Sequence, residues 1–169
     1  MNEENLSRYR QMNREWIKAN RDLIQLYLQK SLVETKKRMD ELYAKSDVEI
    51  FALVRYQVDD NNPYSSSICA LAIQDFPAEK LANGMKMNYV NVEGTFIDKL
   101  GRSKKDKVDH FVWTYGHFII DPTFGQFVNL DEAIARNPQL FEERVLVATA
   151  DEAMKNFGIK YDFSESKTK

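Results

Sequence analysis

The first part of the chain has the mixture of apolar and charged residues that is typical of a helix. Between Asn5 and about Lys45 there is no Pro or Gly, and strong helix formers dominate. Six large apolar residues are spread among the charges: Leu23, Leu26, Leu28, Leu32, Met39 and Leu42. Because they do not keep a seven-residue repeat, the pattern favours one long helix, or two abutting helices, lying over a core rather than a coiled coil.

A helix start signal follows at Ser46 to Glu49. The sequence Ser-Asp-Val-Glu matches a capping box, in which the two end side chains satisfy each other's free backbone amides. This predicts a helix over Val48 to Gln57, although the β-branched and aromatic residues of that segment also suit a strand.

A second helix is predicted after the turn-forming residues 59–63, which read Asp-Asp-Asn-Asn-Pro. The Ser run at 65–67 can cap it, and Pro77 marks its end. Its apolar positions follow the helical spacing i, i+3, i+4 and i+7: Cys69, Ala72, Ile73 and Phe76. The only cysteine of the chain is therefore expected in the first turn or two of a helix.

The second half of the chain is predicted to be mainly strands. Residues Met85–Ile97 and Val108–Asp121 have strand composition, and the polar residues Gly101–Lys107 between them are expected to form a solvated loop. After Pro122 the pattern predicts, in order, a helix over Leu130–Arg136, a strand over Arg144–Val147, a helix from the capping box Thr149–Glu152 to Gly158, and a strand over Ile159–Phe163. We therefore expect an α+β fold in which a helical amino-terminal part and the Cys-bearing helix pack on a small antiparallel sheet. The 169 residues suit a single domain, with a helical segment 1–45, an α+β core 46–163 and a frayed tail 164–169.

The segment from Asp109 to Thr123 predicts a hairpin with a polar pair on one face. If Tyr115-Gly116 forms a two-residue turn, the strands pair Thr114 with His117, Val112 with Ile119, and His110 with Asp121. Residues directly opposite in such a ladder have Cα atoms about 5.5 Å apart, so the imidazole and the carboxylate can form a hydrogen bond. The other face carries four apolar residues that we expect in the core: Phe111, Trp113, Phe118 and Ile120.

Cys69, His110 and Asp121 together supply the parts of a thiol catalyst. The thiolate is the nucleophile, an adjacent His takes its proton, and a carboxylate holds the ring in the useful tautomer. A helix amino terminus near the Cys favours its negative charge. His117 is on the order of 13 Å from His110 along the strands, so one Cys cannot use both.

The order of these elements resembles a known superfamily. A helix-borne Cys, a strand His and an Asp-Pro-Thr on the next strand resemble the transglutaminase-like and arylamine N-acetyltransferase branch of the papain-like cysteine enzymes, over roughly residues 60 to 127. The segment DHFVWTYGHFIIDPTFGQF is the closest part of the likeness. The resemblance implies a nucleophile at Cys69, a general base and acid at His110, and an orienting group at Asp121, acting through a thioester acyl-enzyme. An oxyanion hole would combine the Cys69 backbone amide with a side-chain donor, for which the candidates are Gln57, Asn61, Asn62 and Gln126.

The amino-acid composition argues against several classes of function. The 24 basic and 26 acidic residues leave a formal charge of -2, so no nucleic-acid partner is expected. No apolar run reaches the roughly 18 residues of a membrane span, and the amino terminus lacks the apolar core of a secretory signal, so we expect a cytoplasmic protein without membrane contact. One Cys and two His without zinc-site spacing predict no metal, and no cofactor is expected.

Two functions remain open at this level. The first is a thiol-dependent hydrolase or acyltransferase acting on amide, isopeptide or thioester bonds, with a protein or peptide as substrate; acetyl transfer from coenzyme A ranks lower, because no nucleotide site is recognisable. The second is a catalytically inactive papain-like module that binds a partner, for example through its amino-terminal helix. A single buried Cys, a strand His and an Asp-Pro-Thr turn are each common structural features, and only their combination favours the enzyme. The amino-terminal helix could also cover the catalytic cleft as an autoinhibitory segment.

Overall fold

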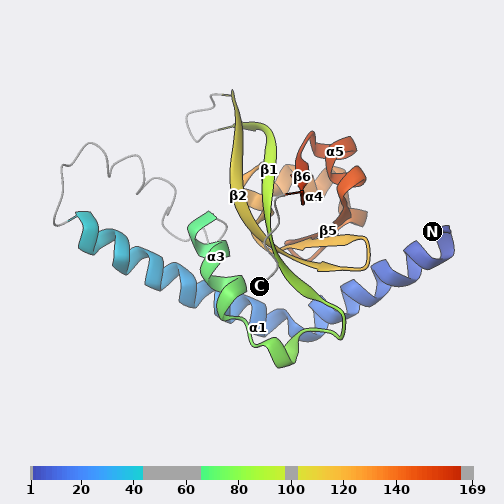
Figure 1. The fold of residues 1–169 in the computed structure, drawn as a ribbon, viewed down its shortest axis with the longest axis horizontal. Coiled ribbons are helices and arrows are strands. Elements are labelled where there is room, and N and C mark those ends of the chain that lie inside the picture. The colour runs from blue at the N-terminus through green and yellow to red at the C-terminus, as the bar shows by residue number, and fades with distance from the viewer. Residues whose placement is uncertain (1, 44–65, 98–102, 165–169) are drawn as a thin grey trace.

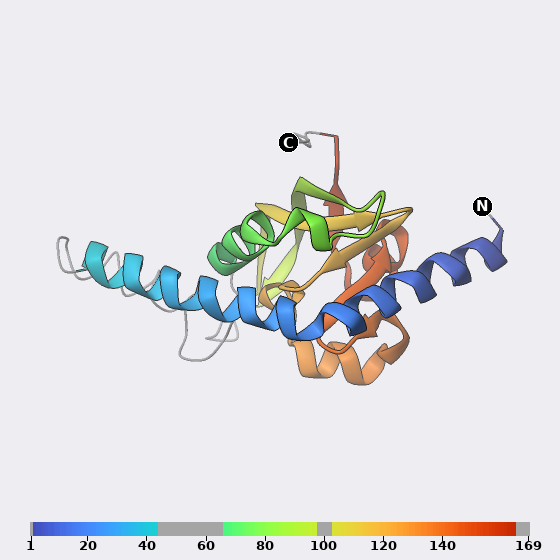
Figure 2. The same ribbon diagram turned by 90° about the horizontal axis from the view of Figure 1, so that it is seen from below.

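The amino-terminal segment forms one uninterrupted helix, α1 (Glu3–Tyr43), in the computed structural model, which describes residues 2–43, 66–97 and 103–164. Its buried positions Ile17, Ile24, Leu28 and Leu32 lie seven or four residues apart and therefore form one stripe along the helix. Figure 2 shows α1 running past the sheet at both ends. The prediction of a long helix lying over a core is confirmed, as one helix rather than two.

The Cys-bearing helix, α3 (Ser66–Asp75), also matches its prediction: it begins within the Ser run and ends just before Pro77. Ala72, Ile73 and Phe76 are buried in the same cluster as the stripe of α1. Figure 1 shows α3 lying between α1 and the sheet. The helix predicted over Val48 to Gln57 lies outside the described residues.

Six strands form one antiparallel sheet in the order β4-β5-β3-β2-β1-β6. Their bounds are β1 (Lys86–Ile97), β2 (Ser103–Tyr115), β3 (Phe118–Asp121), β4 (Phe141–Glu142), β5 (Val145–Thr149) and β6 (Lys160–Asp162). The fold class is therefore α+β, as expected, with an antiparallel sheet beneath the amino-terminal helix.

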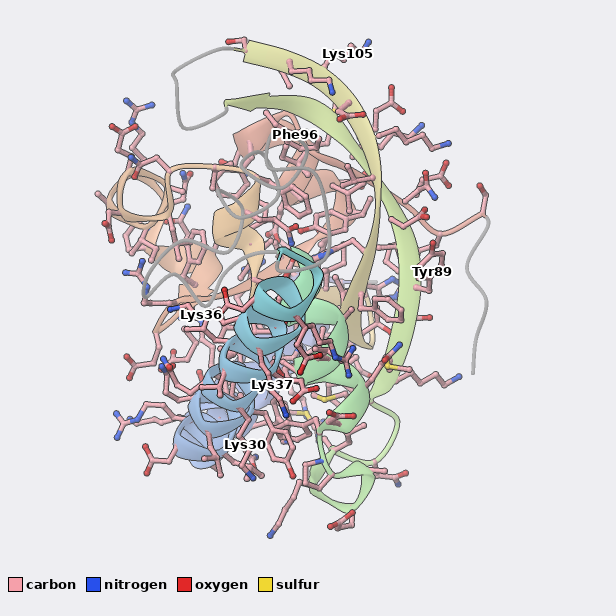
Figure 3. The ribbon with its side chains drawn as sticks, turned by 90° about the vertical axis from the view of Figure 1, so that its left-hand side faces the viewer. Lys30, Lys36, Lys37, Tyr89, Phe96 and Lys105 are labelled. Atoms are coloured by element: carbon pink, nitrogen blue, oxygen red, sulfur yellow. The ribbon has the colours of Figure 1, made fainter. Side chains whose placement is uncertain are left out.

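The long hairpin of β1 and β2 corrects one prediction. Residues 103–107, expected in a solvated loop, extend β2, and they pair with β1 up to Ile97 opposite Ser103. The charged side chains do not prevent this, because the neighbouring strand satisfies the backbone while the side chains stay in water. Figure 3 shows the hairpin curving, with Phe96 on its inner side and Lys105 pointing outward.

Two apolar clusters cover the two faces of the sheet. On one face α1 and α3 pack against Trp113, Phe118 and Ile120, three of the four predicted core residues; the fourth, Phe111, is partly buried against the same cluster. On the other face two short helices, α4 (Leu130–Arg136) and α5 (Ala150–Phe157), complete a second cluster. Its sheet residues are Val90, Val92, Val112, Ile119, Phe141, Leu146, Ala148 and Tyr161.

The elements that were predicted after Pro122 agree closely with their sequence signals, whereas the short strand β4 was not predicted. α4 has its predicted bounds, and the side chain of Asn129 caps it by accepting from the Glu132 amide. The capping box of α5 is formed, and Gly158 ends the helix in the left-handed region at φ 67°. Short elements with strong end signals were thus predictable to within a residue or two.

Candidate functional site

The hairpin of β2 and β3 brings His110 and Asp121 together, but not in the predicted register. The turn is Gly116-His117, with Gly116 at φ 60°, so Tyr115 pairs with Phe118 and Thr114 pairs with Ile119 instead of His117. Gly accepts a positive φ at the first turn position, which leaves Tyr115 in the strand. Continuing this ladder past Trp113 and Ile120 puts Val112, not His110, opposite Asp121.

His110 and Asp121 still meet in the observed register, because the partner of each β2 residue differs from the predicted one by two positions along β3. Side chains alternate with a period of two, so the change keeps His110 and Asp121 on the same face. They become diagonal neighbours, which long side chains can still bridge. The His110 Nε2 lies 2.8 Å from Asp121 Oδ2, in a fully buried contact in which the two residues are 2 % and 0 % exposed.

Asp121 is held by three further hydrogen bonds. Oδ2 also accepts from the Tyr161 hydroxyl at 2.7 Å, and Oδ1 accepts from the Thr123 amide at 3.0 Å and the Thr123 hydroxyl at 3.3 Å. Four donors around one buried carboxylate compensate the loss of water around its charge. The Asp-Pro-Thr turn therefore caps its own backbone and orients His110 at the same time.

Gln126 contacts the other ring nitrogen of His110. It lies in the 3-10 helix η2 (Phe124–Gln126), and its Nε2 is 3.2 Å from His110 Nδ1 and 3.1 Å from the Thr123 carbonyl oxygen. A carbonyl oxygen only accepts, so this second contact identifies the Gln126 atom as the amide nitrogen.

The hydrogen-bond partners Asp121 and Gln126 assign the tautomer of the ring. The Asp121 carboxylate only accepts, so Nε2 carries the proton, and Nδ1 accepts from the Gln126 amide. Nδ1 is thus the basic nitrogen of the neutral ring. The edge-to-face contact with Phe127, at 4.9 Å between ring centroids, packs the ring on its other side.

The structure does not describe the Cys69 side chain or three of the four predicted oxyanion donors. Cys69 belongs to the first turn of α3, but its side chain lies outside the described residues, as do Gln57, Asn61 and Asn62. The pairing of Cys69 with His110 therefore stays a prediction. Gln126 is the one donor candidate that the structure describes, and it lies directly beside His110.

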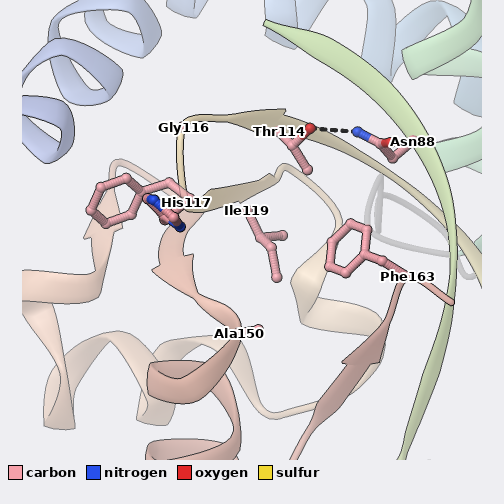
Figure 4. A pocket seen from close by; sticks show the side chains of 8 residues that line it. Asn88, Thr114, Gly116, His117, Ile119, Ala150 and Phe163 are labelled. Carbon is pink, nitrogen blue, oxygen red and sulfur yellow. Dashed lines mark hydrogen bonds between the residues drawn. The ribbon is translucent and has the colours of Figure 1, made fainter. Parts of the chain in front are cut away.

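His117 lies away from the pair, at the hairpin turn. It is exposed and lines a pocket of about 250 Å³ together with Asn88, Thr114, Ile119 and Phe163 (Figure 4). Asn88 donates to the Thr114 hydroxyl at the back of this pocket. Val112 and Ile119, both buried, stand on the sheet between the pocket and His110.

Sequence reasoning missed Tyr161, which lies 40 residues after Asp121 in the chain. It was expected only as a strand residue, and β6 reaches the site by pairing with β1 at the far side of β2. No local signal marks such a contact. The orientation of Gln126 towards the ring, rather than towards a substrate, was likewise not visible in the sequence.

Within the described residues, no three His, Cys, Asp or Glu side chains gather as metal ligands, and no helix is both long and apolar enough to cross a bilayer. No protein-family model, curated protein or solved structure matches the chain. The fold and the site thus define an α+β protein in which the buried residues His110, Asp121 and Tyr161 form a network with the partly buried Gln126.

Proposed function

We propose that this protein is a thiol-dependent hydrolase or acyltransferase of papain-like, transglutaminase-like type, acting on amide, isopeptide or thioester bonds of a protein or peptide substrate. The observation that carries the proposal is the buried His110–Asp121 pair; because the carboxylate only accepts, the proton is assigned to Nε2 and the basic lone pair to Nδ1. A single cysteine in the chain suits a reducing compartment such as the cytoplasm.

The packing of α3 supports Cys69 as the nucleophile. The rings of Phe76 and Trp113 lie 5.0 Å apart, and α3 and β2 run in the same direction in Figure 1. Cys69 is seven residues before Phe76, about 10 Å along a helix, and His110 is three residues before Trp113, about 10 Å along a strand. Cys69 and His110 therefore lie at similar distances from the Phe76–Trp113 contact, one measured along α3 and the other along β2.

The edge of β2 offers a path between the two faces of the sheet. α3 packs on the face of Trp113, whereas His110 points to the opposite face. Among the described strands, β3 pairs with β2 only from Trp113 to Tyr115, so at the level of His110 no described strand flanks β2 on that side. A side chain from the first turn of α3 can approach the ring past this edge.

The reaction follows from this arrangement. The Cys69 thiol gives its proton to Nδ1 of His110, and the thiolate attacks the substrate carbonyl carbon. The resulting imidazolium, stabilised by Asp121, returns the proton to the leaving amine or thiol as the carbon–heteroatom bond breaks, and a thioester remains on Cys69. Water or an acceptor amine then attacks this thioester, giving up a proton to His110, and the thiol is regenerated.

Thiol labelling tests the proposal, because Cys69 is the only thiol of the chain and mass spectrometry reports it alone. We expect iodoacetamide at pH 7 to modify Cys69 at least about tenfold faster than free cysteine, and His110→Ala to remove this advantage. A rate equal to that of free cysteine, unchanged in His110→Ala, would contradict the proposal.

The second candidate is an inactive module that binds a partner through α1. The burial of the His110 ring and the exposed apolar side chains of α1 favour it: Met12, Leu26 and Val33 are 37 %, 46 % and 67 % exposed and lie fourteen and seven residues apart, on one side of the helix. In this case Cys69 reacts with iodoacetamide only after urea unfolds the protein, and Cys69→Ser leaves partner binding unchanged.

A further inference from the structure

The amide of Gln126 occupies the nitrogen that the proposed chemistry needs. We propose that Gln126 is a latch on His110: its N–H closes Nδ1 in the resting protein, and the carbonyl oxygen of an acyl substrate opens the latch by taking that N–H. This inference rests on the proposed function, since it describes how the same site is kept inactive without substrate.

The short 3-10 helix η2 and the preceding Thr123 hold the Gln126 side chain in place. The Gln126 backbone amide donates to the Thr123 carbonyl oxygen at 3.2 Å, and its side-chain nitrogen donates to the same oxygen at 3.1 Å. Thr123 is in turn bonded to Asp121. One turn of chain thus positions both neighbours of the ring, the carboxylate on Nε2 and the amide on Nδ1.

A hydrogen bond to the lone pair of Nδ1 competes with protonation of that atom. The ring cannot accept the thiol proton until the Gln126 N–H has left, and one neutral hydrogen bond of this kind shifts an equilibrium by about two- to tenfold. Among the described residues, the Asp121 carboxylate of β3 and the Tyr161 phenol of β6 are titratable groups near the ring: Asp121 contacts Nε2, and Tyr161 donates to the same carboxylate oxygen.

The proton transfer that follows keeps the Gln126 amide on the substrate. Once Nδ1 carries a proton it no longer accepts, and the Gln126 N–H needs another acceptor. The oxygen of the attacked carbonyl gains negative charge in that step and is a stronger acceptor than the resting ring nitrogen. Gln126 would therefore change from the latch into the side-chain donor of the oxyanion hole.

Nitrogen NMR of His110 tests the latch without any enzyme activity. In 15N-histidine protein carrying Cys69→Ser, we expect a neutral ring protonated at Nε2, with Nδ1 showing the shift of a hydrogen-bonded lone pair. Gln126→Leu should shift the Nδ1 resonance, because the lone pair loses the Gln126 hydrogen bond, and Gln126→Glu should protonate both ring nitrogens at pH 7. Gln139→Leu, an exposed position, is the matched control and should change neither resonance.

The alkylation rate supplies the second readout. With Cys69 present, Gln126→Leu should raise the rate of modification by methyl methanethiosulfonate, a reagent without a carbonyl group, by about two- to tenfold. An unchanged Nδ1 resonance in Gln126→Leu, or an unchanged or lower rate, overturns the latch even if Cys69 depends on His110. Shifted resonances with an unreactive Cys69 would instead retain the Gln126 contact and reject the proposed enzyme.

Discussion

At the scale of single residues, the buried Asp121 accepts hydrogen bonds from several separate parts of the chain. Its two oxygens accept from a ring nitrogen of β2, a phenol of β6, and the backbone amide and hydroxyl of Thr123 in the turn after β3. Each donor separately has an ordinary structural role. Together they fix the orientation and the tautomer of His110, which is what a general base requires.

The hydrogen bond from Tyr161 to Asp121 can be measured by removing a single oxygen. Tyr161→Phe keeps the buried ring but takes one donor from the carboxylate, and we expect the free energy of unfolding to fall by about 2 kcal/mol in urea titrations. Tyr115→Phe is the matched control, because that ring packs on Tyr9 and should cost less than about 0.5 kcal/mol. Equal losses in the two variants would mean that Tyr161 contributes only its ring.

At the scale of elements, the hairpin turn decides the register of the site. Gly116 begins the turn at φ 60°, and a Cβ at this position would lie 3.3 Å from the Tyr9 ring of α1. The turn is therefore constrained twice, by its backbone conformation and by the helix packed against it. Moving it by one residue would change which residues of β2 and β3 pair.

A comparison of Gly116 with Gly158 distinguishes the effect of the backbone conformation from the effect of the contact with α1. Gly158 has nearly the same conformation, at φ 67°, but a Cβ there meets nothing within 4 Å. We expect Gly158→Ala to cost about 1 kcal/mol from backbone strain alone, and Gly116→Ala to cost about 1 kcal/mol more because Tyr9 must move. The measurement is urea unfolding of both variants. Equal costs would show that α1 does not constrain the turn.

The capping box of α5 also joins α1 to the rest of the molecule. Glu152 accepts from the Thr149 amide and forms an ion pair with Arg10 of α1. Burial by itself raises the pKa of Glu152, but the hydrogen bonds from Arg10 and from the Thr149 amide outweigh it and hold the pKa below its ordinary value of 4.5.

The depressed pKa of Glu152 gives a prediction with a definite sign. The ionised form is favoured in the folded state, so its contribution is present above about pH 4.5 and is lost as the pH falls through the lower folded value. Glu152→Gln keeps a capping side chain and should lower the free energy of unfolding at pH 7 by about 1 kcal/mol, since the pair is partly exposed. The difference between the two proteins should shrink as the pH falls below about 4.5. A constant difference would exclude the ion pair as its cause.

On the scale of the whole molecule, α1 belongs to the core. Its buried stripe packs on the face of Trp113, whereas His110 and Asp121 lie on the opposite face with the second cluster. α1 therefore does not cover the face that holds the pair; an autoinhibitory role of α1 on the Cys69 side of the site stays a prediction. Removing residues 1–45 would expose one of the two apolar clusters.

Two neighbouring leucines distinguish core packing from a docking surface on α1. Leu28 is 3 % exposed, and Leu28→Ala should lower the free energy of unfolding by about 3 kcal/mol. Leu26 is 46 % exposed, and Leu26→Ala should change it by less than about 0.5 kcal/mol. Denaturant unfolding of the two variants checks this. Similar losses would place Leu26 in a contact that the described residues do not show.

The sequence by itself determined the local elements and the face of each strand. Helix caps, the Ser run before Cys69 and the glycine at 158 act within a few residues, and the period of two keeps His110 and Asp121 on one face even though the predicted register was wrong. The tertiary structure decided which residue lies opposite which, with the turn at Gly116 lying against Tyr9 of a distant helix. It also brought Tyr161 to Asp121 and turned Gln126 onto the ring, contacts that depend on strand order and packing and leave no trace in the local pattern.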